Sequence, residues 1–445
     1  MKTRSETLTG WGRATRSAAE VSHEQSAEAV AALVRETVRH GTGRGLLARG
    51  LGRSYGDAAL NAGGRVVSTR ALTAIGPLRE DGVVDVAAGA SIEELLRYAV
   101  PRGWFVPVTP GTRHVSIGGA VAADVHGKNH HQDGSIAAHV EQLEVVDGTG
   151  TVRTLGREDA AYGAVVGGMG LAGVVTRARV RLLPIETASM TVQTQRTADL
   201  DSTMAALMEA DRSHRYTVAW LDTLAPGRAL GRAVITSGDH ASSGAVTPLA
   251  GFTTGPVLPA PPWAPSGLLT ASRMRWFNEL YWQRAPHEPR VSRQTIASFF
   301  YPLDVIAGWN RMYGQPGFLQ YQCAVADGEV VREVLDLFRA ERVPGFLAVL
   351  KRFGPGSALP LSFPIPGWTL AVDMPASPAL APVLDRADEL VAASGGRLYL
   401  AKDSRMRLEH VPVMYPELDR WREQRELLDP HHVFSSDLSR RLSLC

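Results

Sequence analysis

The chain has 445 residues, of which 44% are hydrophobic and 21% charged, and its formal net charge is +2. At roughly 100–200 residues per domain this length suggests two or three domains, and the small net charge provides no global attraction for nucleic acid, which we exclude as a partner. The two cysteines, Cys323 and Cys445, are too few for a disulfide framework or a zinc cluster, which favours a reducing compartment.

The first segment, Met1 to Glu24, is polar and charged and contains no apolar core of the kind that a signal peptide needs. No apolar stretch further on reaches the roughly 18 residues that a membrane span requires. We therefore expect a protein that is cytoplasmic or peripheral at a membrane surface, and the sequence leaves the periplasmic face open.

Residues 25–185 predict a region that mixes helices and strands. Apolar residues near helical spacing predict a helix over 25–40. The capping box at residues 91–94 predicts a second helix that ends at Val100. Strands are predicted over 83–87, 104–108 and 174–183, with a hairpin of strands 140–146 and 151–155 around Asp147-Gly148-Thr149-Gly150.

A second region spans residues 186–396, and its middle is rich in proline. The clustered prolines predict a mobile loop over about 240–290; they are Pro248, Pro256, Pro259, Pro261, Pro262 and Pro265. A strand over 317–325 and a helix over 330–342 follow. The last region, 397–445, begins with a turn that carries Lys402 and contains a helix over 418–428.

The segment from Ala48 to Asp57 is rich in glycine. Glycines at 50, 52 and 56 let the backbone turn tightly and approach a ligand, and successive N–H groups there can bind an anion. Arg49 and Arg53 could add charge or serve as structural residues. A loop without a ligand explains the composition about equally well.

Residues 168–173, Gly-Met-Gly-Leu-Ala-Gly, match the dinucleotide pattern Gly-x-Gly-x-x-Gly. That function requires a helix immediately afterwards, whose N-terminus would hold a diphosphate. The following residues, 174–180, alternate like a strand, so a Rossmann site is not expected.

The segment 110–131 combines Pro110-Gly111-Thr112, Ser116-Ile117-Gly118-Gly119 and a group of three histidines with Lys128. Histidines at 126, 130 and 131 invite a metal interpretation, but no cysteine or carboxylate cluster completes a ligand set. The paired glycines favour a backbone that packs against a flat ligand.

Lys402 follows the apolar residues 398–401, which indicates partial burial and suits acid–base chemistry. A solvated surface lysine is the alternative. Gln320 and Gln322 alternate on a predicted strand, and Lys351 precedes Arg352. They could face a polar ligand such as a phosphorylated sugar, or form the wet face of an amphipathic sheet.

Together, these segments resemble the FAD-binding fold of the vanillyl-alcohol oxidase superfamily, also called the PCMH type. The resemblance implies an α+β flavoprotein: residues 1–185 form the FAD-binding domain, 186–396 form a sheet-based substrate-binding domain, and 397–445 return to the first domain. Many relatives carry a histidine, covalently bonded to the flavin, where this chain has Tyr55. The resemblance therefore implies FAD that is bound without a covalent link.

The sequence is more closely similar to the family of decaprenylphosphoryl-β-D-ribose 2'-oxidases, over nearly the whole chain. The matching segments are 8–13, 50–57, 126–131, 317–322, 361–368, 401–405 and 429–437. The resemblance implies hydride transfer from C2 of a lipid-linked ribofuranose to flavin N5, as the first step of epimerisation to the arabinose form for cell-wall arabinan.

The resemblance also assigns site residues. Lys402 and His126 would be catalytic, with Lys402 as the base or as the group that polarises the hydroxyl. The substrate would contact Trp220, Gln320, Gln322, Lys351 and Lys402. FAD would contact Ala48, Arg49, Gly50, Leu51, Gly52, Arg53, Ser54, Tyr55, Gly56, Asp57, Ala58, Gly111, Ser116, Ile117, Gly118, Gly119, Ala123, Asp124, Val125, His126, Val175 and Tyr399.

One departure from the family is Ala371, where relatives often carry the cysteine to which nitroaromatic inhibitors attach. The implied partners are a polyprenyl-phosphoryl ribose, a quinone or oxygen as electron acceptor, an NADPH-dependent keto-reductase and a membrane surface, which the aromatic residues near 263–282 could approach. Two alternatives stay open: a flavin oxidase of another sugar, alditol or nucleoside, and a scaffold without FAD that has no catalytic activity.

Overall fold

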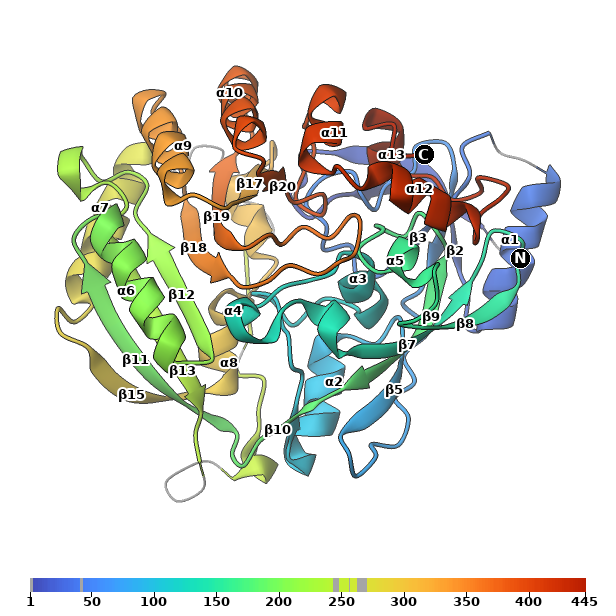
Figure 1. Ribbon diagram of the computed structural model, residues 1–445, viewed down its shortest axis with the longest axis horizontal. Helices are drawn as coiled ribbons and strands as arrows, with labels where there is room; N and C mark the ends of the chain where they lie inside the picture. The colour runs from blue at the N-terminus through green and yellow to red at the C-terminus, as the bar shows by residue number, and fades with distance from the viewer. Residues whose placement is uncertain (1–2, 41–42, 243–247, 256, 262–269) are drawn as a thin grey trace.

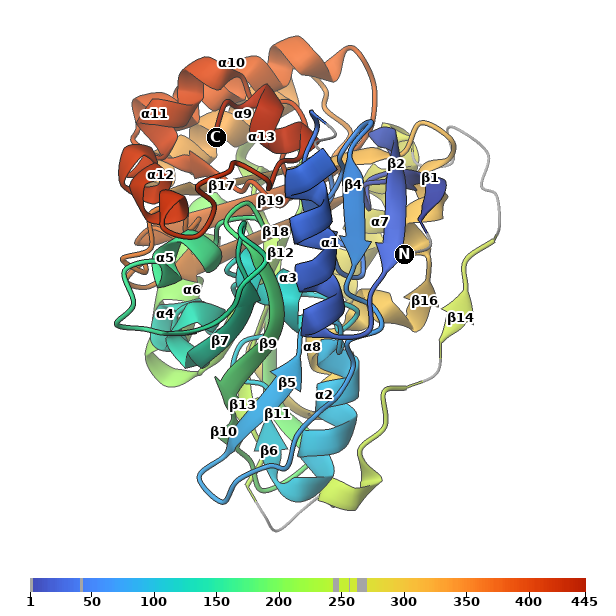
Figure 2. The same cartoon turned by 90° about the vertical axis from the view of Figure 1, so that its right-hand side faces the viewer.

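A computed structural model describes residues 3–40, 43–242, 248–255, 257–261 and 270–445 of the chain. Figure 1 shows a large sheet with its helices on the left and two smaller sheets on the right, and Figure 2 shows the right-hand sheets face on. The C-terminal helices lie above both parts.

The right-hand part contains two sheets of four strands. One has the order β1-β2-β4-β3 and the other β5-β9-β7-β8. The strands are β1 (Arg4–Thr9), β2 (Arg16–His23), β3 (Leu46–Arg49), β4 (Arg65–Ser68), β5 (Val83–Ala87), β7 (Val140–Val146), β8 (Val152–Gly156) and β9 (Val174–Arg181). The helices around them are α1 (Ala27–His40), α2 (Ile92–Ala99), α3 (Ile117–Ala122), α4 (His130–Asp133) and α5 (Tyr162–Val165).

The left-hand part is built on one sheet of eight strands, in the order β15-β11-β13-β12-β18-β19-β17-β20. These are β11 (Ser189–Thr197), β12 (Tyr216–Leu221), β13 (Ala233–His240), β15 (Arg290–Thr295), β17 (Phe318–Val325), β18 (Leu347–Phe353), β19 (Gly367–Pro375) and β20 (Arg397–Leu398). Two short pairs complete the strands: β6 (Trp104–Phe105) with β10 (Leu183–Pro184), and β14 (Leu258–Pro259) with β16 (Ile306–Ala307).

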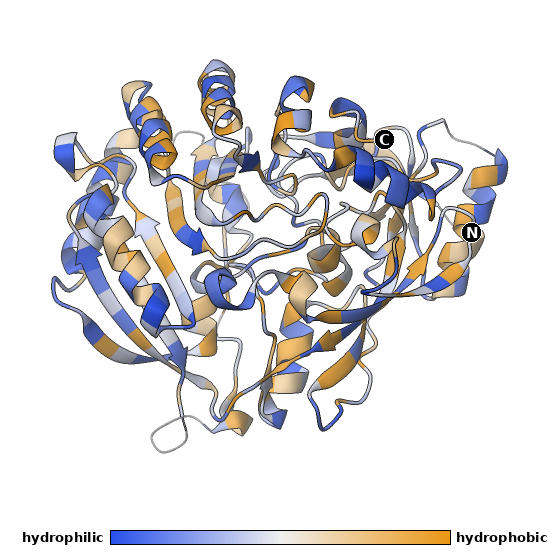
Figure 3. Cartoon of the chain, viewed as in Figure 1, coloured by the Kyte–Doolittle hydropathy of each residue, from blue (hydrophilic) through white to orange (hydrophobic). Residues whose placement is uncertain are grey.

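The outer face of the large sheet forms the core of this part. Ala219, Leu350, Leu370 and Cys323 are cross-strand neighbours in one row, and each is fully buried. The helices α6 (Leu200–Ser213), α9 (Gly328–Ala340) and α10 (Leu380–Ala393) pack on this face. Figure 3 shows hydrophobic residues on the sides of α9 and α10 that face the sheet and hydrophilic residues outside.

Two further helices, α7 (Ala271–Arg284) and α8 (Ile296–Phe300), lie between β13 and β17 in the chain.

The C-terminal residues pack on the right-hand part. Their helices are α11 (Val411–Met414), α12 (Leu418–Glu426) and α13 (Asp437–Arg441). Leu46 N donates to Val433 O at 2.8 Å. Arg441 on α13 pairs with both Asp57 and Asp403 at 2.8 Å. This guanidinium joins the glycine-rich loop to the turn that carries Lys402.

Most of the predicted elements are confirmed, including the capping box of α2, in which Ser91 accepts from Glu94 N at 3.1 Å. The strand predicted over 104–108 is shorter, since only β6 pairs there. The loop predicted over 240–290 is wrong in its last part, because α7 occupies 271–284 and Thr270 caps it. Several of its residues, Pro256, Pro262, Trp263 and Pro265 among them, lie outside the described residues.

Candidate functional site

The glycine-rich loop carries a run of unused hydrogen-bond donors. The backbone N–H groups of residues 50–54 have no acceptor within the described part of the chain, and these residues are only half-buried. Gly52 has a φ of +66°, a conformation that suits glycine. Consecutive N–H groups in such a loop form a site for an anion such as a diphosphate.

Segments from both ends of the chain hold this loop in place. Trp11 N donates to Ser54 O at 2.8 Å, and Tyr55 N donates to Ala401 O at 2.9 Å. A side chain at Gly10 would place its Cβ 2.3 Å from Tyr55 O, so only glycine fits there. The shape of the loop therefore depends on residues far away in sequence.

Arg49 and Arg53 have structural partners. Arg49 donates to Thr9 O and Ala59 O, both at 2.8 Å. Arg53 donates to His114 O at 3.0 Å, and its guanidinium lies 3.8 Å from the centre of the Trp11 ring. Of the two interpretations that the sequence left open, these contacts favour the structural one.

The beginning of α3 lies beside the loop, and a Cβ on Gly50 would lie 2.0 Å from Ser116 Oγ. The first N–H groups of α3 already have acceptors. Ile117 N donates to Ala90 O and Gly118 N donates to Ala88 O, both at 2.8 Å. Ser116 Oγ accepts from Gly119 N at 3.3 Å. This segment therefore offers a close backbone surface, while the free donors come from residues 50–54.

The inner face of the large sheet brings the predicted substrate residues together. Cross-strand pairing puts Trp220, Val349, Ala371 and Gln322 in one row. Since side chains alternate along a strand, Lys351 and Gln320 project from the same face. Most of this face is half-buried, in contrast to the outer row, so it borders open space. Gln320 donates to Asp373 from the neighbouring strand.

His126, from the segment that follows α3, contacts the inner face of the large sheet. Gln322 Nε2 donates to His126 Nε2 at 3.0 Å. The neutral ring then carries its proton on Nδ1, which is buried and has no partner among the described residues. Burial, and secondarily the charge of Lys351, lowers the pKa of His126 well below its usual value, so the ring stays neutral.

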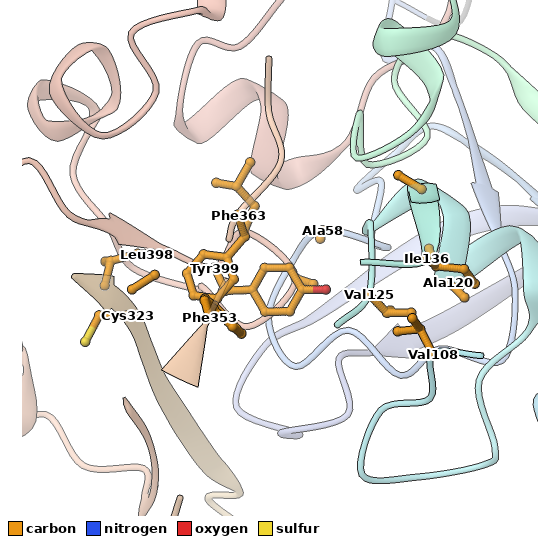
Figure 4. Close-up of a cluster of buried hydrophobic side chains, with 14 of the residues drawn as sticks. Ala58, Val108, Ala120, Val125, Ile136, Cys323, Phe353, Phe363, Leu398 and Tyr399 are labelled. Atoms are coloured by element: carbon orange, nitrogen blue, oxygen red, sulfur yellow. The ribbon is translucent and has the colours of Figure 1, made fainter. Parts of the chain in front are cut away.

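Aromatic rings enclose His126. The ring of Tyr399 lies 5.2 Å from it, and Phe353 lies 4.9 Å away. Tyr399 Oη donates to Ala123 O at 2.8 Å. Figure 4 shows Tyr399 projecting from beside Phe363 toward Val125. Ala58 and Val175 are also buried in this core, at 3% and 6% exposure.

Lys402 lies between the loop and the sheet, with its ammonium 3.5 Å from the centre of the Tyr55 ring. Burial lowers the pKa of Lys402 to about 7, with Asp373 opposing the shift and Lys351 adding to it. Burial likewise raises the pKa of Asp373 to about 7, against the effects of Gln320 and Lys402. Burial therefore moves both pKa values toward neutrality, while the attraction between the two groups favours their charged forms.

Sequence reasoning missed several residues of the site. Asp373 and Thr369 come from β19, and only the register of the sheet places them beside the two glutamines. Lys128 donates to Phe299 O, and its ammonium lies 4.2 Å from the Phe299 ring centre. His130 is fully buried against Phe353, at 4.4 Å between rings. The cluster of histidines at 126, 130 and 131 is the signal in the sequence that could have indicated this part of the site.

Comparisons with known proteins agree with this geometry. The FAD binding domain family matches residues 20–156. The chain is 40% identical to the decaprenylphosphoryl-β-D-ribose oxidase of Mycolicibacterium smegmatis, over 98% of this chain and 97% of that protein. It is 42% identical to an uncharacterised protein of Streptomyces coelicolor, over 80% of this chain and all of that protein. A cytokinin dehydrogenase of Arabidopsis thaliana is 30% identical over 30% of this chain and 27% of its own length.

Lys351→Met should raise the free energy of unfolding at pH 7, because Lys351 is half-buried, incurs a desolvation cost and has no anionic partner in the described structure. Burial lowers the pKa of Lys351 from 10.5 to about 8. Between these two values the unfolded chain binds a proton that the folded protein releases, so the wild type gains stability as pH rises. The advantage of the variant should be largest below pH 8 and disappear above pH 10.5. Urea unfolding at several pH values measures it, and a variant less stable than the wild type at pH 7 would contradict the reasoning.

Proposed function

The chain belongs to the decaprenylphosphoryl-β-D-ribose oxidase family, and on this premise we propose that it oxidises the 2'-hydroxyl of decaprenylphosphoryl-β-D-ribofuranose to a 2'-ketone with FAD. One observation carries the proposal: the N–H donors of 50–54, unpaired among the described residues, lead directly into Tyr55, whose ring contacts Lys402. On the facing sheet, Gln322 donates to a neutral His126. Diphosphate binding, an apolar ring surface and a titratable base are what such an enzyme needs.

The residues present fit FAD. The unpaired donors of 50–54 would hold its diphosphate, and the close backbone of 116–119 would lie along the cofactor. Gly111 has nothing within 4 Å of an added Cβ, so this position borders open space. His126 and Tyr399 would lie at the ring system, where the Nδ1–H of His126 offers a buried donor that has no acceptor among the described residues. When bound, FAD supplies the acceptor for the hydride of the alcohol carbon.

Lys402 is our candidate for the base that takes the hydroxyl proton. With a pKa of about 7, much of this amine is neutral near physiological pH, as a general base requires. The Tyr55 ring holds the amine from one side. Asp373 then stabilises the ammonium that forms, since opposite charges attract strongly in a buried site.

The proposed reaction requires two partners, an electron acceptor and an enzyme that reduces the 2'-ketone. The electrons taken from the sugar must leave the protein, to a quinone or to oxygen. A 2'-ketone becomes the epimeric alcohol only by reduction from the opposite face, so a keto-reductase that uses NADPH would follow in the arabinan pathway.

Lys402→Ala should leave FAD bound and slow its reduction by the substrate about 100-fold or more, the usual contribution of a positioned base. The measurement is anaerobic bleaching of the flavin by a polyprenyl-phosphoryl ribose. Unchanged bleaching would remove Lys402 from the mechanism.

The same measurement on the wild type separates the alternative functions. Bleaching by alditols or nucleosides alone would favour an oxidase of another substrate. A protein without flavin absorbance, even after FAD is added, would favour the scaffold without catalytic activity.

Acid precipitation should release the flavin into the supernatant. The position that carries a tethering histidine in many relatives is Tyr55, whose ring is packed between Lys402 and Phe318. Burial also raises the pKa of Tyr55 well above its usual value, so the phenol remains neutral. A yellow pellet would show a covalent bond and refute the prediction.

A lipid substrate also requires contact with a membrane surface, and we assign this contact to α7. No helix in the described ranges is long and apolar enough to cross a bilayer. On α7, Trp276 is 70% exposed, Phe277 46% and Tyr281 42%. The Tyr281 ring lies 4.7 Å from that of Trp220, so this apolar surface continues to the inner face of the sheet. Exposed aromatic side chains with arginines nearby supply the two contacts, apolar and electrostatic, by which a protein surface binds lipid headgroups.

Trp276→Glu should therefore weaken binding to the membrane. Co-sedimentation with vesicles of phosphatidylglycerol and phosphatidylcholine measures it. Met208→Glu on α6 is the matched control, because Met208 is also an exposed apolar residue, at 42%. Equal sedimentation of the wild type and both variants would exclude α7 as the contact.

A further inference from the structure

Lysine is rare in this chain, and its lysines are concentrated at one place. The sequence has 47 lysines and arginines, of which only four are lysines. Three of them, Lys128, Lys351 and Lys402, surround the site described above, and Lys2 lies outside the described residues. Arginine is the usual cation elsewhere in the chain. Lysine differs in its compact ammonium, which can also lose its proton when buried.

Lys351 is the central member of this group. It projects from the inner face of β18, two residues after Val349. After burial, its charge is the next cause that lowers the pKa of Lys128 to about 7 and that of His130 to about 3. It also acts on Lys402. Geometry supports this grouping. His130 packs against Phe353, which projects from the same face of β18 as Lys351. His126, from the segment that also carries Lys128 and His130, accepts from Gln322 on that face.

The described residues supply too little negative charge for these amines. Among them, only Asp373 raises the pKa of any of the three lysines, and it acts on Lys402. Lys351 has no hydrogen bond or ion pair in the described structure, and Lys128 uses one donor, toward Phe299 O. Both ring nitrogens of His130 are buried, and neither has a partner within the part of the chain that the structure describes. Buried donors and charges left in this state indicate a missing anionic ligand.

We propose that Lys128 and Lys351, with His130 beside them, bind the phosphodiester of the substrate, which leaves Lys402 free for the sugar hydroxyl. The inference rests on the proposed function and adds its phosphate site. In a ribose linked through its anomeric phosphate, the phosphodiester is on C1, next to the reacting C2. An anion site beside Lys402 is therefore where the chemistry requires it. From there, Trp220 and α7 continue toward the outside and fit the lipid chain.

The test compares a charged and a neutral substrate. Anaerobic flavin reduction is measured with farnesylphosphoryl-β-D-ribofuranose and with octyl β-D-ribofuranoside, in the wild type, Lys128→Met and Lys351→Met, all with FAD bound. Loss of a hydrogen bond to a charged group weakens binding by about 10- to 100-fold. We expect this increase in the dissociation constant for the phosphoryl riboside and a change of less than about twofold for the neutral riboside. Farnesyl phosphate should inhibit the wild type and lose the same factor against both variants.

The matched control is Arg352→Met. Arg352 is the neighbour of Lys351 on the same strand, but it projects from the opposite face and pairs with Asp211 at 3.2 Å. Its removal deletes the same charge and should leave both dissociation constants unchanged. Lys351→Arg should recover most of the affinity for the phosphoryl riboside, which a merely structural role would not produce.

The outcomes separate the two proposals. If the wild-type flavin is reduced by no riboside, the proposed function fails. If it is reduced, but both lysine variants keep the wild-type dissociation constants for the phosphoryl riboside and farnesyl phosphate, the phosphate site is refuted. Equal losses for the charged and the neutral riboside would also refute it, because the lysines would then support the shape of the pocket and not the anion.

Discussion

The strand register of the large sheet is the constraint on which the candidate site depends. Pairing of β12, β18, β19 and β17 places Trp220, Ala371 and Gln322 in one row and turns their neighbours, Leu370 and Cys323 among them, into the core. A shift of one residue in any of these pairs would exchange the two faces. The apolar outer face, covered by α6, α9 and α10, therefore determines which side chains can reach the substrate.

The lysines at the inner face of the large sheet have too few negative charges around them among the described residues. Burial disfavours the charge on Lys128, Lys351 and Lys402, and among the described residues only Asp373 opposes this effect, at Lys402. Such an arrangement reduces stability, and proteins commonly retain it where a ligand uses it. The large cores on both sides of the site make this cost tolerable.

Local signals in the sequence predicted much of the fold, because capping boxes, hairpin turns and alternating strands act over a few residues. The capping box of α2 and the β7–β8 hairpin are examples. The prolines before residue 266 obscured α7, whose own residues contain no proline. The approach of Lys402 to the site was suggested by its apolar neighbours. Asp373 and Lys128 could not be assigned to the site from the sequence, because their places there come from pairing and packing between distant segments.

The ion pairs of Arg441 have a consequence for the order of events during synthesis. This guanidinium reaches Asp57 in the glycine-rich loop and Asp403 beside Lys402, and α13 lies at the end of the described chain. A nascent chain can fold its first sheets on the ribosome and hold the loop through Trp11, but the ionic link between the two segments forms only after residue 441 has emerged. The geometry of the flavin site therefore depends on a residue that is synthesised 384 positions after Asp57 of the glycine-rich loop, so the loop reaches its final shape only after translation has passed residue 441.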